Sequence, residues 1–350
     1  MITRNQALWL LFILLLAAAG VTYFYKSRSV KGKSLADFAI SDTSVVDKIF
    51  ISDPNGNAVT LERIPGEFLW QLNGTYKARK DAVDLLLKTF LRLEVKAPVP
   101  STAKENIIRN MAGNGRKCEV YVNGNIHKIY YIGGPTRDNY GTYAMLETPD
   151  EGRSTDPYIV QVSGFAGFLT PRFFTNEEDW RYTGIFRYPS LEFSKISLQY
   201  YPDSSGNFSI SYNGGNNLSL FDGAGNIFSV FDTLAVKDYL LLFKKVHFEN
   251  YNSGLNPAQE DSVFSLRPNV TITLVENNGV ERKLTLWLKK SSKPIEDQGI
   301  LLQWDPDHLY GSTDGEDLVL CQHFVFDPML RPIQSFSRRD YPIVPAYLWQ

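Results

Sequence analysis

Residues 82–90 read Ala-Val-Asp-Leu-Leu-Leu-Lys-Thr-Phe, and residues 235–243 read Ala-Val-Lys-Asp-Tyr-Leu-Leu-Leu-Phe. The apolar residues of the first stretch return at one constant offset, the 153 residues that separate Ala82 from Ala235. Because they recur every three or four residues, they lie on one face of a helix. The sequence therefore predicts one amphipathic helix, packed on a sheet, in each half of the chain.

Each predicted helix has an aspartate at its start and strand patterns before it. Asp81 and Asp232 are predicted N-caps, because an aspartate side chain can accept hydrogen bonds from the first amides of a helix. The predicted strands alternate apolar and polar residues, and Gly, Pro, Asn and Asp mark the turns between them. In the first half the strands span 47–52, 58–63 and 68–72, with a turn at 53–57, and in the second half 194–200 and 207–212, with a turn at 202–206.

A hairpin is predicted after each helix. Asn123-Gly124 stands between alternating stretches in the first half, and Asn278-Gly279 does so in the second, 155 residues later. Asn-Gly favours a tight hairpin because both residues accept positive φ. Strand pair, helix and hairpin thus recur in the same order at a nearly constant offset, which predicts an internal duplication.

The predicted fold class is α+β: an N-terminal transmembrane helix followed by two tandem, duplicated, mainly antiparallel-sheet units, each with a packed helix. The aromatic residues of the connector between the units are expected to pack between the two units. The C-terminal arm, rich in Pro, is expected to be extended and to dock on the body or on a partner. The predicted divisions are a short N-terminal tail (1–6), a transmembrane anchor (7–25), a basic linker (26–44), the first unit (45–170), the connector (171–190), the second unit (191–326) and the arm (327–350).

The composition is typical of a globular protein and argues against one class of partner. Hydrophobic residues make up 43% and charged residues 21% of the chain, and 22 Phe with 19 Tyr favour sheet. A nucleic-acid binder is expected to carry a basic surface, and the formal net charge of −2 therefore argues against nucleic acid as a partner. The only cysteines, Cys118 and Cys321, are too few for a zinc site and are expected to be buried, although pairing between them stays open.

The membrane anchor is predicted from an uncharged stretch at residues 5–25. A helix of this length spans roughly 30 Å, the thickness of the hydrocarbon core of a bilayer. The alternatives are a buried core helix or a cleavable signal peptide, for which Ala17-Ala18-Ala19-Gly20 offers a cleavage site. Because the apolar run continues to Tyr25 before Lys26 ends it, we expect an uncleaved anchor.

The residues beside the anchor leave its orientation open. One basic side chain, Arg4, precedes the span, and Lys26, Arg28, Lys31 and Lys33 follow it. By the positive-inside rule this excess places the body in the cytoplasm. A six-residue tail before the span is instead typical of a signal anchor that exports the residues after it.

The first unit is similar to the bacterial family called domain of unknown function 4340. The resemblance lies in Phe68-Leu69-Trp70, in residues 82–87 and in the Asn123-Gly124 hairpin with Ile132-Gly133-Gly134, and it covers roughly residues 45–165. The second unit departs from it, with no Trp at the place of Trp70 and with Lys289-Lys290 near the place of the two glycines. The resemblance implies a single-pass protein of the bacterial inner membrane with a periplasmic body. Some family members resemble accessory parts of gliding-type ABC transport systems, and the family assigns no catalytic residues.

No motif in the sequence predicts catalysis, a cofactor or a bound metal. The four histidines are not in metal-ligand spacing, the acidic stretch matches no calcium-binding loop, and the Gly-containing turns lack the Gly-Lys-Ser/Thr of a phosphate loop. A glycosidase, whose two carboxylates need only meet in space, stays open. The residues considered are His127, His247, His308 and His323; Asp305, Asp307, Asp314, Glu316 and Asp317; Gly133-Gly134-Pro135; and Gly164 to Gly167.

We therefore expect a non-enzymatic, membrane-anchored envelope protein that acts as an interaction or scaffold module for a membrane protein complex. Its expected partners are the membrane and envelope or membrane proteins, with an ABC transporter as one candidate. Sheet edges and the Pro-rich tail are the expected contact surfaces. The alternatives are a ligand-binding auxiliary component of a gliding-type ABC transport system and an envelope glycan hydrolase.

Overall fold

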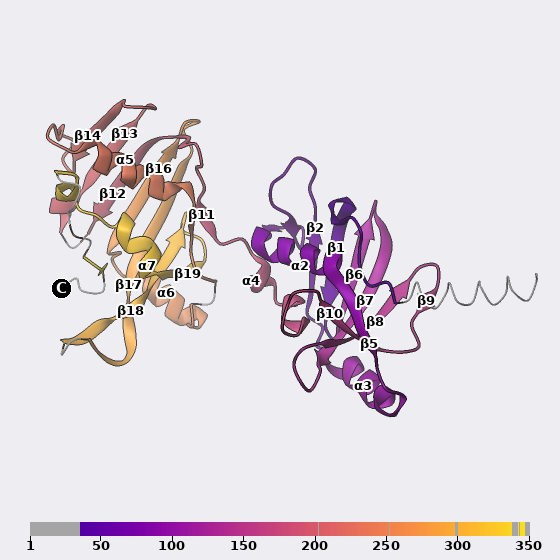
Figure 1. Ribbon diagram of the computed structural model, residues 1–350. Coiled ribbons are helices and arrows are strands. Elements are labelled where there is room, and N and C mark those ends of the chain that lie inside the picture. Colours follow the sequence, from indigo (N-terminus) through magenta and orange to yellow (C-terminus); the bar gives the residue numbers. More distant parts are fainter. Residues whose placement is uncertain are drawn as a thin grey trace, which may run out of the picture. The chain divides into compact units, whose positions relative to one another are not determined.

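The computed structural model describes residues 36–201, 203–251, 253–297, 300–337, 342 and 344–346. It divides into two compact units between Tyr182 and Thr183 (Figure 1), and this boundary falls inside the stretch 171–190. Each unit combines helices with a sheet, and every strand pair among the described residues is antiparallel. The predicted α+β class with mainly antiparallel sheet is confirmed.

Unit 1 is built on a ten-stranded sheet in the order β4-β3-β2-β1-β6-β7-β8-β10-β5, with β9 beside β8. The predicted strands near 47–52 and 58–63 and the Asn123-Gly124 hairpin are confirmed. The predicted strand at 68–72 shrinks to two residues, because Phe68 and Leu69 lie in a bend. The strands are β1 (Val46–Ser52), β2 (Ala58–Glu62), β3 (Gln71–Leu72), β4 (Tyr76–Lys77), β5 (Leu93–Pro98), β6 (Arg116–Val122), β7 (Asn125–Pro135), β8 (Thr142–Thr148), β9 (Gly152–Arg153) and β10 (Tyr158–Val162).

Helix α2 (Lys80–Arg92) buries one apolar face against the sheet of unit 1, and Val83 and Phe90 are almost completely inaccessible. The prediction that Asp81 caps this helix is wrong. The helix begins at Lys80 and its N-cap is Arg79, so Asp81 lies in the first turn, where it pairs with Arg79 at 2.7 Å. The remaining helical segments of unit 1 are η1 (Thr43–Val45), α3 (Ser101–Asn114), η2 (Thr170–Arg172) and α4 (Glu177–Trp180).

The fold of unit 1 begins inside the predicted basic linker 26–44. Phe38 and Ile40 belong to the hydrophobic core of unit 1. The hydroxyl of Tyr130 donates to the carbonyl of Phe38 at 2.8 Å, and Lys128 Nζ donates to the carbonyl of Ala39 at 2.6 Å. Residues from about 37 onward are therefore part of the packed unit. The sequence did not predict this, because these residues form irregular backbone and have no periodic pattern.

Unit 2 is built on a seven-stranded sheet in the order β14-β13-β12-β16-β17-β18-β19. The predicted strands at 194–200 and 207–212 and the hairpin around Asn278-Gly279 are confirmed. Asn123 and Gly124 both have positive φ (51° and 75°), whereas in the second hairpin Gly279 (88°) has positive φ and Asn278 does not. The strands are β11 (Gly184–Phe186), β12 (Phe193–Tyr200), β13 (Phe208–Tyr212), β14 (Leu218–Asp222), β15 (Val246–His247), β16 (Val270–Glu276), β17 (Glu281–Asp297), β18 (Ile300–Thr313) and β19 (Leu318–Gln322), and β11 pairs with β15.

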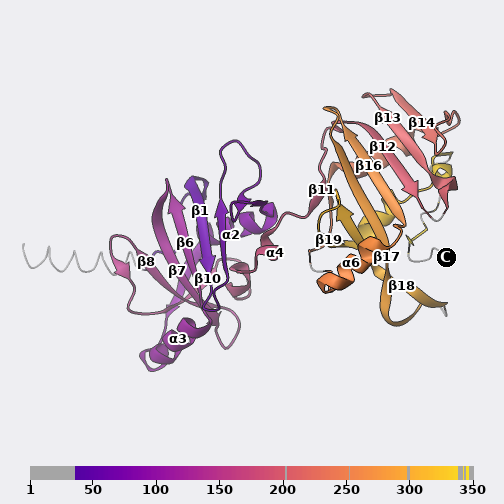
Figure 2. The ribbon, with the colours of Figure 1, turned by 180° about the vertical axis from the view of Figure 1, so that it is seen from behind.

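Two helices cover opposite faces of the sheet of unit 2 (Figures 1 and 2). Helix α5 (Thr233–Leu241) packs in the main core with Leu286, while Val263 of α6 (Pro257–Ser265) packs with Trp287. Leu286 and Trp287 point to opposite faces because side chains alternate along a strand. The predicted N-cap Asp232 is confirmed, since its carboxylate accepts from the amides of Leu234 and Ala235.

The segment after β19 is folded into the core of unit 2, which contradicts the prediction of an extended arm from residue 327. It forms α7 (His323–Phe326), η5 (Asp327–Met329) and η6 (Ile333–Ser337). Phe336 is fully buried and stacks edge-on against Phe208 and Tyr239. The prolines interrupt the apolar periodicity of the sequence, which suggested an extended arm, but the segment forms short helical turns instead. Residues 347–349 of the predicted arm lie outside the described residues.

The aromatic residues of the stretch 171–190 do not pack as predicted. Phe173 and Trp180 are buried in the core of unit 1, and Phe186 is buried in the core of unit 2. Each therefore stabilises its own unit, because the short irregular segments around β10 and β11 fold back onto the adjacent sheet.

Strands in corresponding positions have the same neighbours in both sheets. The order β2-β1-β6-β7-β8-β10 of unit 1 corresponds to β13-β12-β16-β17-β18-β19 of unit 2. Both helices α2 and α5 follow the first strands, and both begin beside a buried aromatic residue. The amide of Arg79 donates to the carbonyl of Trp180 at 2.7 Å, and the amide of Asp232 donates to that of Phe336 at 2.7 Å.

The predicted membrane anchor at residues 7–25 lies outside the described residues. In the part of the chain that the structure describes, no helix combines the length and hydropathy needed to cross a bilayer.

Candidate functional site

The four histidines considered from the sequence lie in separate settings. His127 is on β7 of unit 1, where partial burial and the neighbouring Lys128 lower its pKa. In unit 2, His247 Nδ1 lies 3.2 Å from the hydroxyl of Thr183, and His308 Nε2 lies 2.8 Å from Glu249. His323 is buried, with Nδ1 2.9 Å from Asp327. His247, His308 and His323 thus each have a partner of their own, and no candidate metal-binding group among the described residues contains two of the four histidines.

The acidic stretch of the sequence is divided in the structure. Asp305 and Asp307 lie in the middle of β18, whereas Asp314 lies in the turn that follows this strand. There Asp314 accepts the amide of Lys283 at 2.7 Å and lies 3.5 Å from Arg282. Glu316 and Asp317 belong to the same turn, so the five carboxylates do not surround one point.

Asp305, Asp307 and His308 are the one group among the described residues whose ligand atoms lie close enough to hold a metal ion. Asp305 Oδ1 already accepts the amides of Asp307 (2.9 Å) and His308 (3.0 Å), and Oδ2 is paired with Lys289. Burial raises the pKa of Asp305, but these hydrogen bonds outweigh it and lower the pKa below its ordinary value. The carboxylate is therefore ionised and already neutralised by Lys289, an arrangement typical of a structural ion pair.

An open hollow of about 410 Å³ adjoins this part of β18 and is lined by Pro306, Asp307, His308, Gln322 and Phe324. Phe324 is 90% exposed, the most exposed large apolar side chain in the described part of the chain. The hollow offers an aromatic surface beside polar groups, which suits a contact with another molecule better than enclosure of a small ligand.

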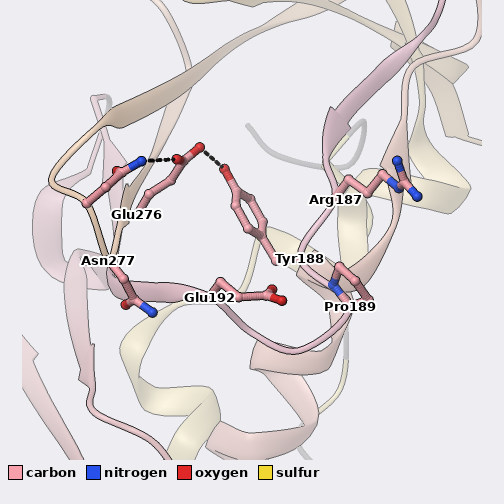
Figure 3. A pocket seen from close by; sticks show the side chains of 7 residues that line it. Arg187, Tyr188, Pro189, Glu192, Glu276 and Asn277 are labelled. Carbon is pink, nitrogen blue, oxygen red and sulfur yellow. Dashed lines mark hydrogen bonds between the residues drawn. The ribbon is translucent and has the colours of Figure 1, made fainter. Parts of the chain in front are cut away.

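A second open hollow, of about 340 Å³, lies where β16 ends and contains two carboxylates (Figure 3). The hydroxyl of Tyr188 donates to Glu276 Oε1 at 2.8 Å, and the Asn278 side chain donates to Oε2 at 3.2 Å. Glu192 lies on the same hollow, and its Oε2 accepts the amide of Ser190 at 3.2 Å.

The pKa of Glu276 is shifted in the direction opposite to that of the general acid of a glycosidase. A glycosidase needs one carboxyl group with a raised pKa as its general acid. The hydrogen bond from Tyr188 instead lowers the pKa of Glu276, and burial together with this bond raises the pKa of Tyr188. Glu276 is thus held as a carboxylate that orders the hairpin turn.

Both cysteines are fully buried and free, Cys118 on β6 in unit 1 and Cys321 on β19 in unit 2. Burial raises the pKa of each thiol. The expectation of two buried small apolar side chains is confirmed, and the pairing left open by the sequence does not form. Neither thiol is in the electropositive, exposed setting of a reactive cysteine.

The Gly-containing turns are structural. A Cβ at Gly133 would stand 2.7 Å from the side chain of Met111, so this glycine allows α3 to approach β7 closely. Gly164 and Gly167 have φ of 78° and 155°, and the ring between them, Phe165, lies 4.1 Å from the guanidinium of Arg172.

The described surface of unit 2 also carries an apolar segment that the sequence patterns missed. Ile227 is 74%, Val230 78% and Leu234 53% exposed, all within eight residues before and at the start of α5. The backbone at the start of this segment pairs with the edge strand β14, where Ile227 bridges Phe221 and the amide of Phe228 donates to the carbonyl of Leu220. We call residues 227–234 the edge segment.

No motif marks the edge segment in the sequence, but a difference between the two halves of the chain does. At the offset of the two helices, Val230 takes the place of Lys77 and Leu234 that of Asp81. Comparing the two halves of the chain at this offset would have found apolar residues at the places of two charged ones. Phe324, Lys289 and Glu249 could not have been found, because only the folded chain brings them beside His308 or Asp305.

No family model, no curated protein and no solved structure matches this chain.

Proposed function

We propose that this protein is a non-enzymatic, membrane-anchored interaction module of the bacterial cell envelope, which holds a scaffold beside the inner membrane for other membrane or envelope proteins. The uncharged stretch at residues 5–25 supports the anchor. The resemblance of residues 45–165 to the domain of unknown function 4340 family supports a periplasmic body and an ABC transporter as one candidate partner. The basic residues after the anchor favour the opposite orientation, so orientation is a separate part of the proposal.

We also infer that the two units arose by duplication of one unit. Three observations support this inference: the constant offset of the two helices, the shared order of strands, and the matching hydrogen bonds of Arg79 to Trp180 and of Asp232 to Phe336. The last pair is informative because 153 residues separate Arg79 from Asp232, the offset of the helices. Duplication of a stable scaffold frees one copy to change its surface.

One observation carries the proposed function: unit 2 exposes large apolar side chains, while its candidate titratable groups Glu276, Asp305 and His308 are engaged in local pairs. Phe324, Val230 and Ile227 are 90%, 78% and 74% exposed. Ile227, Val230 and Leu234 lie within one stretch of eight residues, and exposed apolar side chains that gather at a surface mark sites of contact with other proteins. The candidate acid Glu276, in contrast, is held ionised by Tyr188.

The test is affinity capture of the full-length chain from native membranes after chemical crosslinking. We expect at least one membrane or envelope protein to be enriched about tenfold or more over a capture with an unrelated single-span protein. Phe324→Ser should reduce the enrichment, whereas Tyr140→Ser, which removes an exposed aromatic side chain from unit 1, should not.

Two results would contradict the proposal. One is capture of the chain with no enriched protein under any crosslinking condition. The other is release of sugar fragments from envelope glycans by the purified chain with loss of that activity in Glu276→Gln, since this would make the second hollow a catalytic site. A reporter fused after Gln350 decides the orientation separately.

A further inference from the structure

Phe324 presents its aromatic ring to solvent from a helix that is otherwise packed against unit 2. His323 and Phe326 of the same helix, α7, are buried, whereas Phe324 is 90% exposed. An apolar ring in water is unfavourable, because burial of apolar surface is the dominant favourable term in folding and association. A contact that covers this ring would therefore be favourable.

The pairing of β18 with β19 places a carboxylate beside this ring. The two strands are antiparallel and His308 pairs with Gln322. Asp307, which precedes His308, therefore lies on the same side as Phe324, which follows Gln322. Both side chains line the open hollow of about 410 Å³.

Asp307 is the carboxylate of this region that remains available to another molecule. Both oxygens of Asp305 are engaged, Oδ1 by two backbone amides and Oδ2 by Lys289. Glu249 is paired with His308 Nε2 at 2.8 Å. Within the part of the chain that the structure describes, the exposed carboxylate of Asp307 takes part in no hydrogen bond or ion pair.

The charges around the hollow favour a cation. Glu249, Asp305 and Asp307 carry three negative charges, and Lys289 and His308 supply two positive charges at most. The exposed ring adds the negative face of its π system. A guanidinium group matches both features, because it is planar, stacks on aromatic faces and donates to carboxylates.

Unit 1 covers its own rings with guanidinium groups. Those of Arg153 and Arg172 lie 3.9 Å and 4.1 Å from the ring centres of Tyr131 and Phe165. At Tyr131 a carboxylate is present as well, since Glu147 accepts from its hydroxyl at 2.7 Å and lies opposite Arg153 in the strand register. The ring and carboxylate at the hollow of unit 2 offer a similar setting to an arginine from outside.

We propose that Phe324 and Asp307 of unit 2 bind an arginine side chain of a partner protein. The guanidinium stacks on the ring of Phe324 and donates to the carboxylate of Asp307, and the aliphatic part of the arginine lies in the hollow. Lysine suits this site less well, because its compact ammonium has no planar face to stack on the ring. This inference rests on the proposed function and names the chemistry by which one surface of unit 2 recognises a partner.

The test places the photoreactive amino acid p-benzoylphenylalanine at Gln322, an exposed residue of the hollow, in the full chain in its native membranes. The exposed Tyr140 of unit 1 carries it in the control protein. We expect irradiation to join position 322, but not position 140, to a second protein. Mass spectrometry should place the bond close to an arginine of that protein.

Two substitutions separate the two parts of the site. Phe324→Leu keeps an apolar side chain and removes the ring, so we expect it to lower the crosslink yield about two- to fivefold. Asp307→Asn keeps the size of the side chain and removes its charge, with a loss of up to about fivefold. Glu281→Gln, at another exposed carboxylate of unit 2, and Leu266→Ser, at a 61% exposed leucine, should leave the yield unchanged.

An exchange of charges tests the contact itself. Asp307→Arg should abolish the crosslinked product, because it places like charges against each other. Replacement of the partner's arginine by aspartate should restore the product in this variant and should lower it in the unchanged chain.

The outcomes separate this inference from the proposed function. A partner captured by affinity whose crosslink from position 322 changes in neither Phe324→Leu nor Asp307→Asn overturns the arginine site and leaves the interaction module standing. A full yield in Phe324→Leu alone also overturns it, since any apolar side chain would then suffice.

Two further results decide the source of the arginine. A bond from position 322 only to the chain itself overturns the inference, and its loss in the double variant Arg338→Gln, Arg339→Gln would show that the chain fills the site with its own arginine. If no position and no affinity capture yields a partner, both proposals fail.

Discussion

Glu276 illustrates how the titratable side chains of this protein are engaged. Its pKa is lowered chiefly by the hydrogen bond from Tyr188. A carboxyl group with a lowered folded-state pKa contributes stability above its ordinary value of 4.5, and this stability is lost as pH falls through the lowered folded value.

We therefore predict that Glu276 titrates below 4.5 in the folded chain and that Tyr188→Phe moves the titration upward, toward 4.5. Tyr188→Phe should also make unfolding less dependent on pH in this acid range, because less of the favourable interaction is then lost on protonation. Nuclear magnetic resonance of the glutamate side chain measures the pKa directly. A Glu276 that titrates above its ordinary value would be poised as a general acid and would favour the hydrolase alternative.

The two thiols give a second prediction at this scale. Cys118 and Cys321 are both fully buried, and burial raises their pKa. Neither should react with a disulfide reagent in the folded chain at neutral pH, and both should react once the chain is unfolded in urea. Reaction of either thiol in the native protein at the rate of an exposed thiol would show that its unit opens readily.

At the scale of elements, the segment after β19 is the most informative. Phe336→Ala removes a fully buried ring that contacts Phe208 and Tyr239, so we expect it to destabilise unit 2 by about 3–5 kcal/mol. The matched control Phe324→Ala removes a 90% exposed ring of the same segment and should change stability by about 0.5 kcal/mol or less. Urea unfolding monitored by fluorescence measures both. Equal effects would mean that the segment is a loosely attached arm.

The elements show which parts of the fold local patterns could predict. The strands at 47–52 and 194–200, the two helices and both Asn-Gly hairpins were predictable, because periodicity and turn chemistry act over a few residues. The helix start at Lys80 was missed, since Arg79 is held by the carbonyl of Trp180, which lies far away in the sequence.

Other elements depended on contacts that no local pattern contains. Residues 327–337 have the prolines of an extended arm, but the burial of Phe336 determines their conformation. Residues 37–40 join unit 1 because Lys128 and Tyr130 bind their carbonyl groups. The edge segment could not be predicted from a motif either, because it is recognised only when Lys77 is compared with Val230.

At the scale of the whole chain, two units of similar construction differ in the side chains that they expose. Unit 1 closes its sheet with the segment around Arg181, and unit 2 presents Val230 and Leu234 at the corresponding place. Under the proposed function the chain acts through the proteins it holds, so we expect it to occur in native membranes as part of a larger assembly.

Blue-native electrophoresis of mildly solubilised native membranes measures whether the chain belongs to a larger assembly. We predict that the full-length chain, with a mass of 39.7 kDa, migrates in a complex with at least one other protein and returns toward the mobility of the purified chain in the double variant Val230→Lys, Leu234→Asp. The opposite result, in which the chain from native membranes migrates as the purified chain does and the variant changes nothing, would contradict the account.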